Sequence, residues 1–370
     1  MGSKLTISDI ARLAGVSKAT VSRVINQKAN VDPTTRERVL RIINEKGFVP
    51  SITASGLAGG RSRLIGVLSP PFTWPFVPEI MRGVAELMEH TSYEIVLYSI
   101  NPTRSHHDVL DRIIGMRLTS GLLAILPGKL SKHLTDLRDH GLPIVVIDDQ
   151  GPPVDLPWVG INNFESAYEA TRHLIELGHR RIAHIQGPVD FRCTAERIEG
   201  YRQALIEVGI DPDPRLMLEG GFVTEGGSAC AHKLFTLDAN ERPTAIFSAN
   251  DQMAYGLIDV AAEYGIRVPE DVAIVGFDDE LLSSYIKPAL TTIRQPFYDM
   301  GKVAIELLMS FVDPQFSFPD DQTYKRAEAA LIVQQLLNNR EGKEPLHCHL
   351  PTRLVVRESC GAAQHISLSG

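Results

Sequence analysis

Two kinds of chemically active side chain are grouped in the sequence, paired acids and clustered histidines. The acid pairs, Asp148-Asp149 and Asp278-Asp279, each follow an apolar run that ends like a buried strand. A hydrolase uses paired carboxylates as acid and base, but nothing near these pairs identifies their catalytic roles. His106-His107 and the histidines on either side of Cys348 lack a four-ligand spacing. We therefore expect no metal site and no cofactor.

The loops that hold phosphates in enzymes are also missing. The sequence has no P-loop and no GxGxxG after a strand, and the pair Gly226-Gly227 is too weak a signal. The four cysteines form no CxxC pair, which is typical of a reduced, cytoplasmic chain. No apolar run of ~18–20 residues is present, so we expect no membrane segment, and the polar first residues lead us to expect no signal peptide. An α/β enzyme of the ribokinase or hydrolase type is thus the weakest of the functional hypotheses.

Charge is divided unevenly along the chain. The first 63 residues hold eleven Lys and Arg against four acids, whereas the rest holds 26 basic and 41 acidic residues. The net charge of −8 is therefore the sum of a +7 segment and a −15 body. A small basic module joined to an acidic body indicates polyanion binding at one end.

Three short helices are expected before residue 48. The first begins at Thr6, where Thr6 to Asp9 resemble a capping box, and it ends at Gly15. The second begins after Ser17, and the third begins with Asp32-Pro33, a cap followed by proline. Helix, glycine turn and helix form the helix-turn-helix pattern, in which the second helix enters the DNA major groove.

The expected reading helix carries side chains suited to DNA. Lys18 and Arg23 fit guanine edges, and Ala19 is small enough to approach a thymine methyl. Hydroxyl and amide side chains nearby suit phosphate oxygens. The predicted headpiece contacts are Thr6, Ser17, Lys18, Ala19, Thr20, Ser22, Arg23 and Asn26.

The strings Ala14-Gly15-Val16-Ser17 and Thr20-Val21-Ser22-Arg23-Val24-Ile25-Asn26 closely resemble the lactose/galactose repressor (LacI/GalR) family of bacterial transcription regulators. The resemblance continues through 47–50 and 57–59 and reaches 350–357, so it covers nearly the whole chain. It implies a helix-turn-helix DNA-binding domain at 1–49, a hinge at 50–62, a ligand-binding and dimerisation core at 63–360, and a tail at 361–370.

Residues 50–63 can form only a short helix, far below the ~12–15 residues that hold alone in water. The resemblance implies that this hinge helix folds in the minor groove. Leu57 matches the leucine that wedges into a base step, and Ala58 lies beside it. A plain Gly/Ser linker is the alternative.

From Leu64 onward, apolar runs alternate with amphipathic helices, a doubly wound α/β pattern. The expected strands lie at 64–68, 95–98, 121–126, 143–147, 181–186, 244–248 and 272–277. The fold class is an N-terminal all-α helix-turn-helix headpiece plus an α/β core of two doubly wound parallel-sheet subdomains. The resemblance implies that this core is periplasmic-binding-protein-like. We expect one subdomain at 63–161 and 292–325, and the other at 162–291 and 326–360. The 311–345 segment is longer than the family usually has, with an extra helix at 324–338.

The resemblance also implies a ligand-binding cleft. Arg197 matches the family's ligand-contacting arginine, Asp278 matches an aspartate at the far end of the pocket, and Phe222 matches an aromatic position over the ligand ring. Asn250 and Asp148 follow strands and are expected beside them. The loop at 69–76 adds Phe72, Trp74 and Phe76, with Trp158 as a further aromatic candidate at the cleft.

The polar set favours the hydroxyls of a carbohydrate, and a purine or nucleoside is the alternative ligand. We interpret the chain as a ligand-responsive repressor of sugar or glycoside utilisation genes. It would act as a homodimer on a pseudo-palindromic operator in double-stranded DNA and be released by a sugar effector. Two competing hypotheses are a corepressor-dependent regulator and a sugar-binding module without a DNA role.

Overall fold

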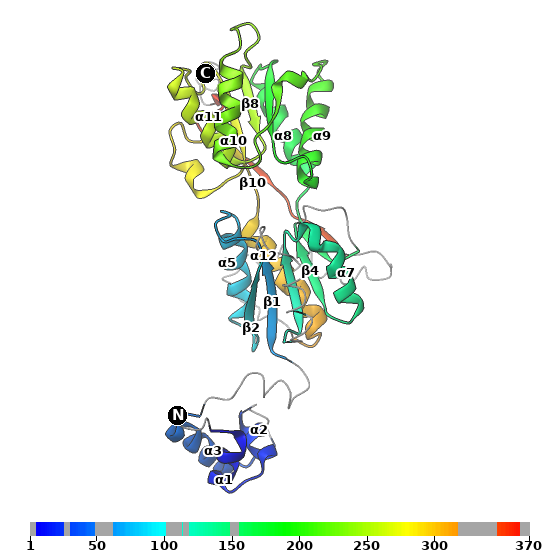
Figure 1. Ribbon diagram of the computed structural model, residues 1–370, viewed down its shortest axis with the longest axis vertical. Helices are drawn as coiled ribbons and strands as arrows, with labels where there is room; N and C mark the ends of the chain where they lie inside the picture. Colours follow the sequence, from blue (N-terminus) through cyan, green and yellow to red (C-terminus); the bar gives the residue numbers. More distant parts are fainter. Residues whose placement is uncertain are drawn as a thin grey trace, which may run out of the picture. The chain divides into compact units, whose positions relative to one another are not determined.

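The computed structural model describes residues 5–25, 30–48, 62–100, 113, 118–148, 155–316 and 346–362 (Figure 1). The chain divides into two compact units, and each is considered separately. One unit, the headpiece, comprises residues 1–64 with 116–120, and the other, the core, comprises 65–115 with 121–370.

The headpiece contains α1 (Ile7–Ala14), α2 (Lys18–Ile25) and α3 (Pro33–Lys46). The expected helix ends are confirmed. Thr6 and Asp9 form a complete capping box, and Asp32 caps α3 through the Thr35 amide with proline at the first position. Gly15 and Gly47 end their helices at positive φ. The apolar faces meet in a small core of Ile10, Ala11, Ala14, Val21, Val24, Val39 and Phe48.

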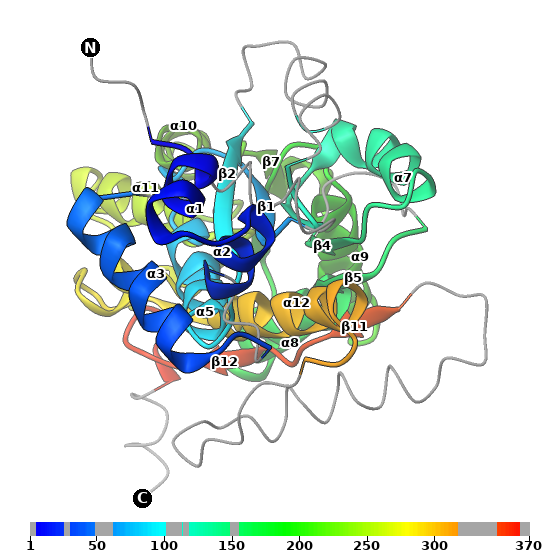
Figure 2. The ribbon, with the colours of Figure 1, turned by 90° about the horizontal axis from the view of Figure 1, so that it is seen from below.

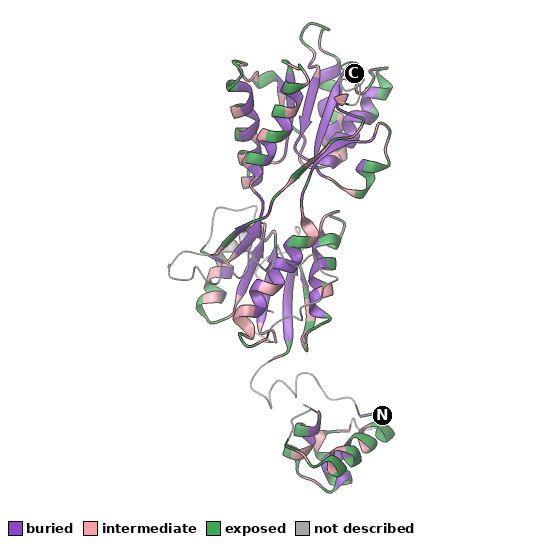
Figure 3. Cartoon of the chain, turned by 180° about the vertical axis from the view of Figure 1, so that it is seen from behind, coloured by how far each residue is buried: buried purple, intermediate pink, exposed green. Residues whose placement is uncertain are grey.

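The first sheet of the core has the order β11-β5-β4-β3-β1-β2. Its strands are β1 (Leu64–Ser69), β2 (Glu94–Ser99), β3 (Gly121–Ile125), β4 (Ile144–Ile147), β5 (Trp158–Gly160) and β11 (His347–His349). The pairs from β1 through β3, β4 and β5 to β11 are all parallel. Strands β1, β3, β4 and β5 are buried along their whole length, as expected for strands covered on both faces (Figure 3).

The second sheet has the order β12-β10-β9-β8-β6-β7. Its strands are β6 (Ile182–Gln186), β7 (Met217–Glu219), β8 (Ala245–Ser248), β9 (Ala273–Asp278), β10 (Thr291–Arg294) and β12 (Arg353–Val355). Strands β6 to β10 pair in parallel, whereas β12 pairs antiparallel with β10 at the edge. Counting strands within each half, both sheets have the order 2-1-3-4-5-6, and the first five strands follow the order of a flavodoxin-like doubly wound fold.

Helices cover the sheets in packed pairs. In the second half, α8 (Asn163–Glu176) packs on α9 (Arg192–Ile206), and α10 (Thr224–Phe235) packs on α11 (Asp251–Glu263) (Figure 1). In the first half, α5 (Val77–Met88) and α12 (Phe297–Val312) lie side by side, and α7 (Ser131–Asp139) is separate from this pair (Figure 2). A Cβ on Gly301 would overlap the carbonyl of Ile80, so the α5–α12 approach depends on glycine.

The expected subdomain limits differ from the structure at two places. Residues 326–360 were expected in the second subdomain, but β11 pairs with β5 of the first sheet. Residues 292–294 were expected in the first, but β10 belongs to the second sheet. The chain therefore crosses between the halves at 161–162, 295–296 and 350–352. Three-residue strands carry no periodicity, which is why β5, β7, β11 and β12 were not expected from the sequence.

Several expectations lie outside the described residues. They are the hinge helix with Leu57 and Ala58 and the extra helix at 324–338. Among the helices in the described ranges, none combines the length and apolarity that a membrane crossing requires.

The capping box makes a direct prediction about the headpiece. Replacing Thr6 by alanine removes the acceptor for the Asp9 amide, which costs about 1 kcal/mol of helix stability. Amide hydrogen exchange measured over residues 7–14 should become roughly fivefold faster. Thr6→Ser retains the hydroxyl and should restore the slow exchange, whereas equal exchange in all three proteins would contradict the role of the cap.

Candidate functional site

The outer face of α2 presents the predicted DNA contacts in the headpiece. Residues 18, 19, 22 and 23 lie at helical spacing on one face, because positions three and four apart are neighbours. Lys18, Ala19 and Arg23 are exposed, and Val21 and Val24 turn the opposite face into the headpiece core. Lys18 and Arg23 make no hydrogen bond or ion pair with any residue in the described ranges. Their charges are therefore available for an external anion.

The hydroxyl residues of this face also have roles within the headpiece. Ser17 accepts from the Thr20 amide, and the two side-chain oxygens lie 2.9 Å apart. Thr6 is held in its capping box, and its hydrogen bonds lower the pKa of Asp9. These three side chains are thus placed by local hydrogen bonds before DNA is present. Asn26, Leu57 and Ala58 lie outside the described residues.

A cavity of about 490 Å³ lies in the core where the carboxyl ends of both sheets face the same space. This is the position at which ligands bind in doubly wound folds. The first half contributes the loop after β1, the ends of β3 and β4, and the start of α12. The second half contributes the loops after β6, β7, β8, β9 and β10. The lining residues are Thr73, Trp74, Pro75, Phe76, Ile80, Leu126, Asp148, Pro188, Phe191, Cys193, Arg197, Gly221, Phe222, Val223, Thr224, Glu225, Asn250, Gln252, Asp278, Glu280, Gln295, Phe297 and Met300.

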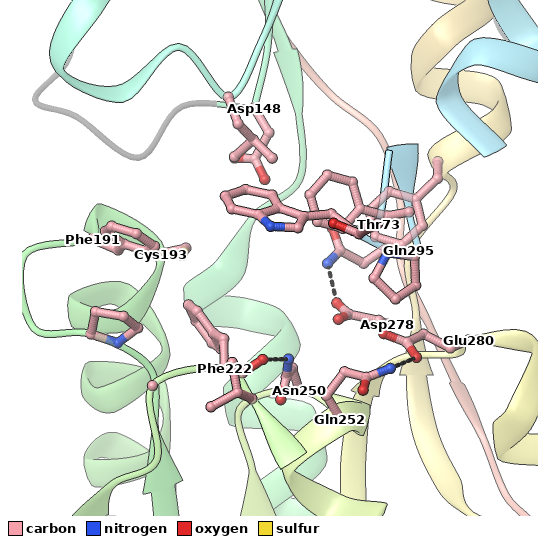
Figure 4. Close-up of a pocket in the computed structure, with 18 of the residues that line it drawn as sticks. Thr73, Asp148, Phe191, Cys193, Phe222, Asn250, Gln252, Asp278, Glu280 and Gln295 are labelled. Carbon is pink, nitrogen blue, oxygen red and sulfur yellow. Dashed lines mark hydrogen bonds between the residues drawn. The ribbon is translucent and has the colours of Figure 1, made fainter. Parts of the chain in front are cut away.

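Seven of the eight side chains predicted for the cleft line this cavity: Trp74, Phe76, Asp148, Arg197, Phe222, Asn250 and Asp278. Phe72 does not, because the 71–77 turn directs residues 73–76 to the cavity and leaves Phe72 exposed. Trp158 is also absent from the lining, since it is buried in β5 between His347 and His349. Figure 4 shows the Asp148 carboxylate and the Phe222 ring approaching the cavity from opposite sides.

Arg197 is buried and held in place by three contacts. Its Nε donates to Asn163 at 3.0 Å, and its Nη1 donates to the carbonyl of Ala249. The guanidinium carbon lies 3.7 Å from the centre of the Phe277 ring. Such stacking fixes the plane of the guanidinium. Nη2 has no partner among the described residues, and it is the nitrogen left for a ligand.

Asp278 forms the polar end of the cavity together with Gln295. Gln295 Nε2 donates to the Asp278 carboxylate at 2.6 Å (Figure 4). Burial raises the pKa of Asp278 well above its usual range, although Arg197 opposes the shift. The buried Oε1 of Gln295 has no hydrogen-bond partner among the described residues. A buried acceptor without a partner favours a ligand that donates a hydrogen bond there.

Phe222 is fixed by its backbone. Its φ of 64° is in the left-handed region, and its carbonyl accepts from Asn250 Nδ2 at 3.1 Å. Asn250 also caps α11 through the Met253 amide. The Phe222 ring lies against Gly187, where any Cβ would overlap it. Asn250 therefore positions the Phe222 side chain. Both the nitrogen and the oxygen of its side-chain amide form hydrogen bonds within the protein.

The sequence alone did not identify a second polar chain in the cavity. Gln252 donates to Glu280 at 2.5 Å and accepts from Thr224 at 3.1 Å. Burial raises the pKa of Glu280. Each of these residues closely follows a strand, so the fold pattern could have indicated Gln252 and Glu280. Gln295 follows β10, whose four residues gave no such signal.

Asp251 supports this end of the cavity without lining it. It accepts from Ser283 and Thr292, each at 2.6 Å, and from the Glu280 amide at 2.9 Å. Asp251 thereby ties the start of α11 to the loop that carries Glu280. Burial raises the pKa of Asp251 to about 7, although these donors favour its ionised form. Within the described residues, no group of three or more His, Cys, Asp or Glu is arranged to hold a metal ion.

Two segments of the chain match known protein families. Residues 6–51 match the family described as bacterial regulatory proteins, lacI family. Residues 171–319 match the periplasmic binding protein-like domain.

Similar proteins cover most of the chain. Catabolite control protein A of Priestia megaterium is 34% identical over 313 residues, which are 84% of this chain and 93% of that protein. The lac repressor dimer bound to operator and the anti-inducer ONPF has a TM-score of 0.79 at 26% identity, covering 96% of this chain and 99% of the other. The complex of the transcriptional regulator CelR with cellobiose has a TM-score of 0.65 at 31% identity, with the same coverage.

The Asp251 network predicts how stability changes with pH. In the unfolded chain Asp251 ionises near its ordinary value of 3.8, whereas the folded chain keeps it protonated to about pH 7. Between these values the folded state binds more protons, so the contribution of Asp251 to the free energy of unfolding falls as pH rises. Asp251→Asn cannot titrate. Its melting temperature should therefore decline less from pH 4 to pH 7 than that of the unmodified protein.

Asp259→Asn is the matched control, because Asp259 lies exposed on the same helix. It should reproduce the pH profile of the unmodified protein. Parallel profiles for Asp251→Asn and the unmodified protein would show that Asp251 ionises normally in the folded state.

Proposed function

Because the chain belongs to the lacI family of bacterial regulatory proteins, we propose that it is a homodimeric repressor whose operator affinity is controlled by a small molecule in the core cavity. Members of this family are DNA-binding transcriptional regulators, and so is this chain. The observation that supports effector control best is that both halves of the core line the cavity. Trp74 and Asp148 come from the first half of the core, whereas Arg197 and Asp278 come from the second.

A ligand that touches both halves changes the free energy of their relative orientation. It can shift operator affinity only as far as it binds the two orientations differently. A cavity lined by one half alone would give binding without this coupling. The crossings at 161–162, 295–296 and 350–352 are the backbone connections about which the halves would reorient.

The reading face of α2 is the proposed operator contact. Two copies of the headpiece in a homodimer would place two such helices on a pseudo-palindromic site, because protein twofold symmetry matches half-site symmetry. The charge supports this use, since the 63-residue segment carries +7 and the remainder −15. The acidic body is repelled by the duplex, so the basic segment provides the contact.

The hinge is the proposed link between effector and operator. Leu57 and Ala58 would enter the minor groove, and the cost of unstacking a base step would be offset by a bent, more extensively contacted duplex. Effector-driven separation of the two hinges would remove this contact and release the DNA. Regulators of this kind act on chromosomal DNA, so the proposed site of action is the cytoplasm.

The proposed effector is a carbohydrate. The carboxylate oxygens, Nη2 of Arg197 and Oε1 of Gln295 can form hydrogen bonds with ligand hydroxyls, and the aromatic side chains offer apolar faces. The related CelR structure holds cellobiose, which agrees with this class. A nucleoside also presents a flat apolar face. Tighter binding of a nucleoside than of any carbohydrate would replace the carbohydrate as the proposed effector. Since Asp278 and Glu280 are committed to Gln295 and Gln252, the proposed role of the cavity is binding without catalysis.

Arg23→Ala tests the reading face. Losing a bidentate contact to guanine should weaken operator binding by about 1–3 kcal/mol, or roughly 5- to 150-fold. Fluorescence anisotropy on an operator selected from genomic fragments, and on a scrambled duplex, measures both affinities. The loss should be much larger on the operator.

Arg38→Ala is the control for charge, because Arg38 is exposed on α3 and carries the same charge. It should lower both affinities by a similar small factor. If Arg23→Ala and Arg38→Ala behave alike on the operator, Arg23 does not read bases.

Arg197→Ala tests effector control. Removing a charged hydrogen-bond donor from the cavity should reduce effector affinity roughly 10-fold or more, while operator affinity without effector stays unchanged. Titrating the effector into the protein–operator complex measures the response. Asp278→Asn keeps the side-chain volume and should also weaken the response. A normal response in both variants would place the effector elsewhere.

A further inference from the structure

We propose that the effector is an uncharged molecule of two linked sugar rings, and that the cavity rejects phosphorylated and carboxylated sugars. This inference rests on the proposed function and narrows its ligand class. Four observations support it separately: the acidic lining of the cavity, the hydrogen bonds that Arg197 already makes, the two aromatic surfaces and the cavity volume.

The charged side chains of the described lining are mostly acidic. Four carboxyl groups accompany one guanidinium, and they belong to Asp148, Glu225, Asp278, Glu280 and Arg197. Cys193 adds no charge, because burial raises the pKa of its thiol to about 11. A phosphate or carboxylate on the ligand would meet the same burial that raises the pKa of Asp278 and Glu280, so this cavity disfavours a further negative charge. Hydroxyl groups instead donate to such acceptors, so a polyhydroxylated neutral ligand is complementary to them.

Arg197 cannot offer its side-on fork to a ligand anion. The side-on fork that arginine offers to a carboxylate or phosphate uses Nε and Nη2 together. Nε has a single hydrogen and donates it to Asn163. Nη1 gives one hydrogen to Ala249. The guanidinium can thus donate to a hydroxyl oxygen through Nη2, but the side-on fork is closed.

Among the helix starts at the cavity, that of α10 already has an acid in its first turn. Helices α9 and α10 begin there without a side-chain cap, and their first amides are donors. Helix α10 carries Glu225 in its first turn, which already complements its dipole. A hydroxyl oxygen accepts from such amides without adding a further negative charge to the cavity.

Two separate aromatic surfaces line the cavity, one from each half. In the first half, Trp74 and Phe76 have ring centres 5.8 Å apart, and Phe76 stacks on Phe297 at 5.4 Å. In the second half, Phe191 and Phe222 have ring centres 6.1 Å apart. Each surface can cover the apolar face of one sugar ring, and together they accommodate two.

The volume agrees with two rings. A cavity of about 490 Å³ lies within the range of roughly 300–1,000 Å³ that is typical of pockets for drug-sized ligands. A disaccharide occupies more of this space than a single hexose, because it has about twice as many non-hydrogen atoms. Filling both aromatic surfaces at once also connects the two halves of the core, as effector control requires.

The test measures how tightly a panel of ligands binds the full-length protein, by isothermal titration calorimetry and by tryptophan fluorescence. The panel contains cellobiose, maltose, lactose, sucrose and trehalose, with glucose, galactose, fructose, glucose 6-phosphate, glucuronate, cellobiose 6-phosphate, maltose 6-phosphate and adenosine. At least one uncharged disaccharide should bind with a Kd below 1 mM and at least 10-fold more tightly than its own monosaccharides. Phosphorylated disaccharides should bind at least 10-fold more weakly than their uncharged parents.

Two variants identify the surfaces responsible. Trp74→Ala should lower disaccharide affinity at least 10-fold and change monosaccharide affinity by less than threefold. Trp158→Phe is the matched control, because Trp158 is buried in β5 and does not line the cavity, and it should leave disaccharide affinity unchanged. Glu225→Gln removes an exposed carboxylate of the lining and should reduce the discrimination against the phosphorylated disaccharide.

The outcomes separate this inference from the proposed function. Preferred binding of a monosaccharide, a nucleoside or any anionic sugar, or no binding of any uncharged disaccharide, would overturn the two-ring assignment while operator binding persists. Failure to bind any genomic fragment would instead overturn the proposed repressor, whatever the cavity binds.

Discussion

The parallel pairing of strands is the constraint on which the core depends. Parallel strands bring their carboxyl ends to one edge, and the first five strands of each half repeat this arrangement in the order 2-1-3-4-5. Residues as distant in sequence as Trp74, Arg197 and Gln295 meet only because each follows a strand. Buried apolar residues stabilise the sheets independently of the loops, so the loop side chains can vary. Ligand specificity can therefore change without any change in the fold.

Buried hydrogen bonds help to keep these loops in position. Asp251 holds the loop after β9, Asn250 holds Phe222, and Gln295 holds Asp278. Asp279 adds a further link, because the side chains of Arg294 and Arg357 both pair with it. A buried acid of this kind is costly unless its donors are supplied, and here each acid has donors from neighbouring loops. Because these buried carboxylates need hydrogen-bond donors from neighbouring loops, the same hydrogen bonds also fix the positions of those loops.

Local signals predicted more of this molecule than long-range ones. Thr6 with Asp9, Asp32 with Pro33, and Gly15 and Gly47 each specify a helix end within a few residues, so the sequence alone locates the headpiece helices. The long apolar strands follow equally well from pattern. The strands of three residues do not, because their pairing depends on neighbours far away in sequence, as β11 with β5. The family resemblance indicates Arg197 and Asp278, whereas the partners that orient them, Asn163 and Gln295, are apparent only in the structure.

The three chain crossings have a consequence for the order in which the protein can form. The first sheet needs α12 for cover and β11 as its last strand, and both are translated after the whole second sheet except β12. A ribosome that releases the chain from its amino end therefore cannot finish the first half early. The second half has the consecutive strands β6 to β10 and can form all of its sheet except the edge strand β12 while the first half still waits. The part of the core nearest the headpiece in sequence thus depends on some of the last-translated residues of the core.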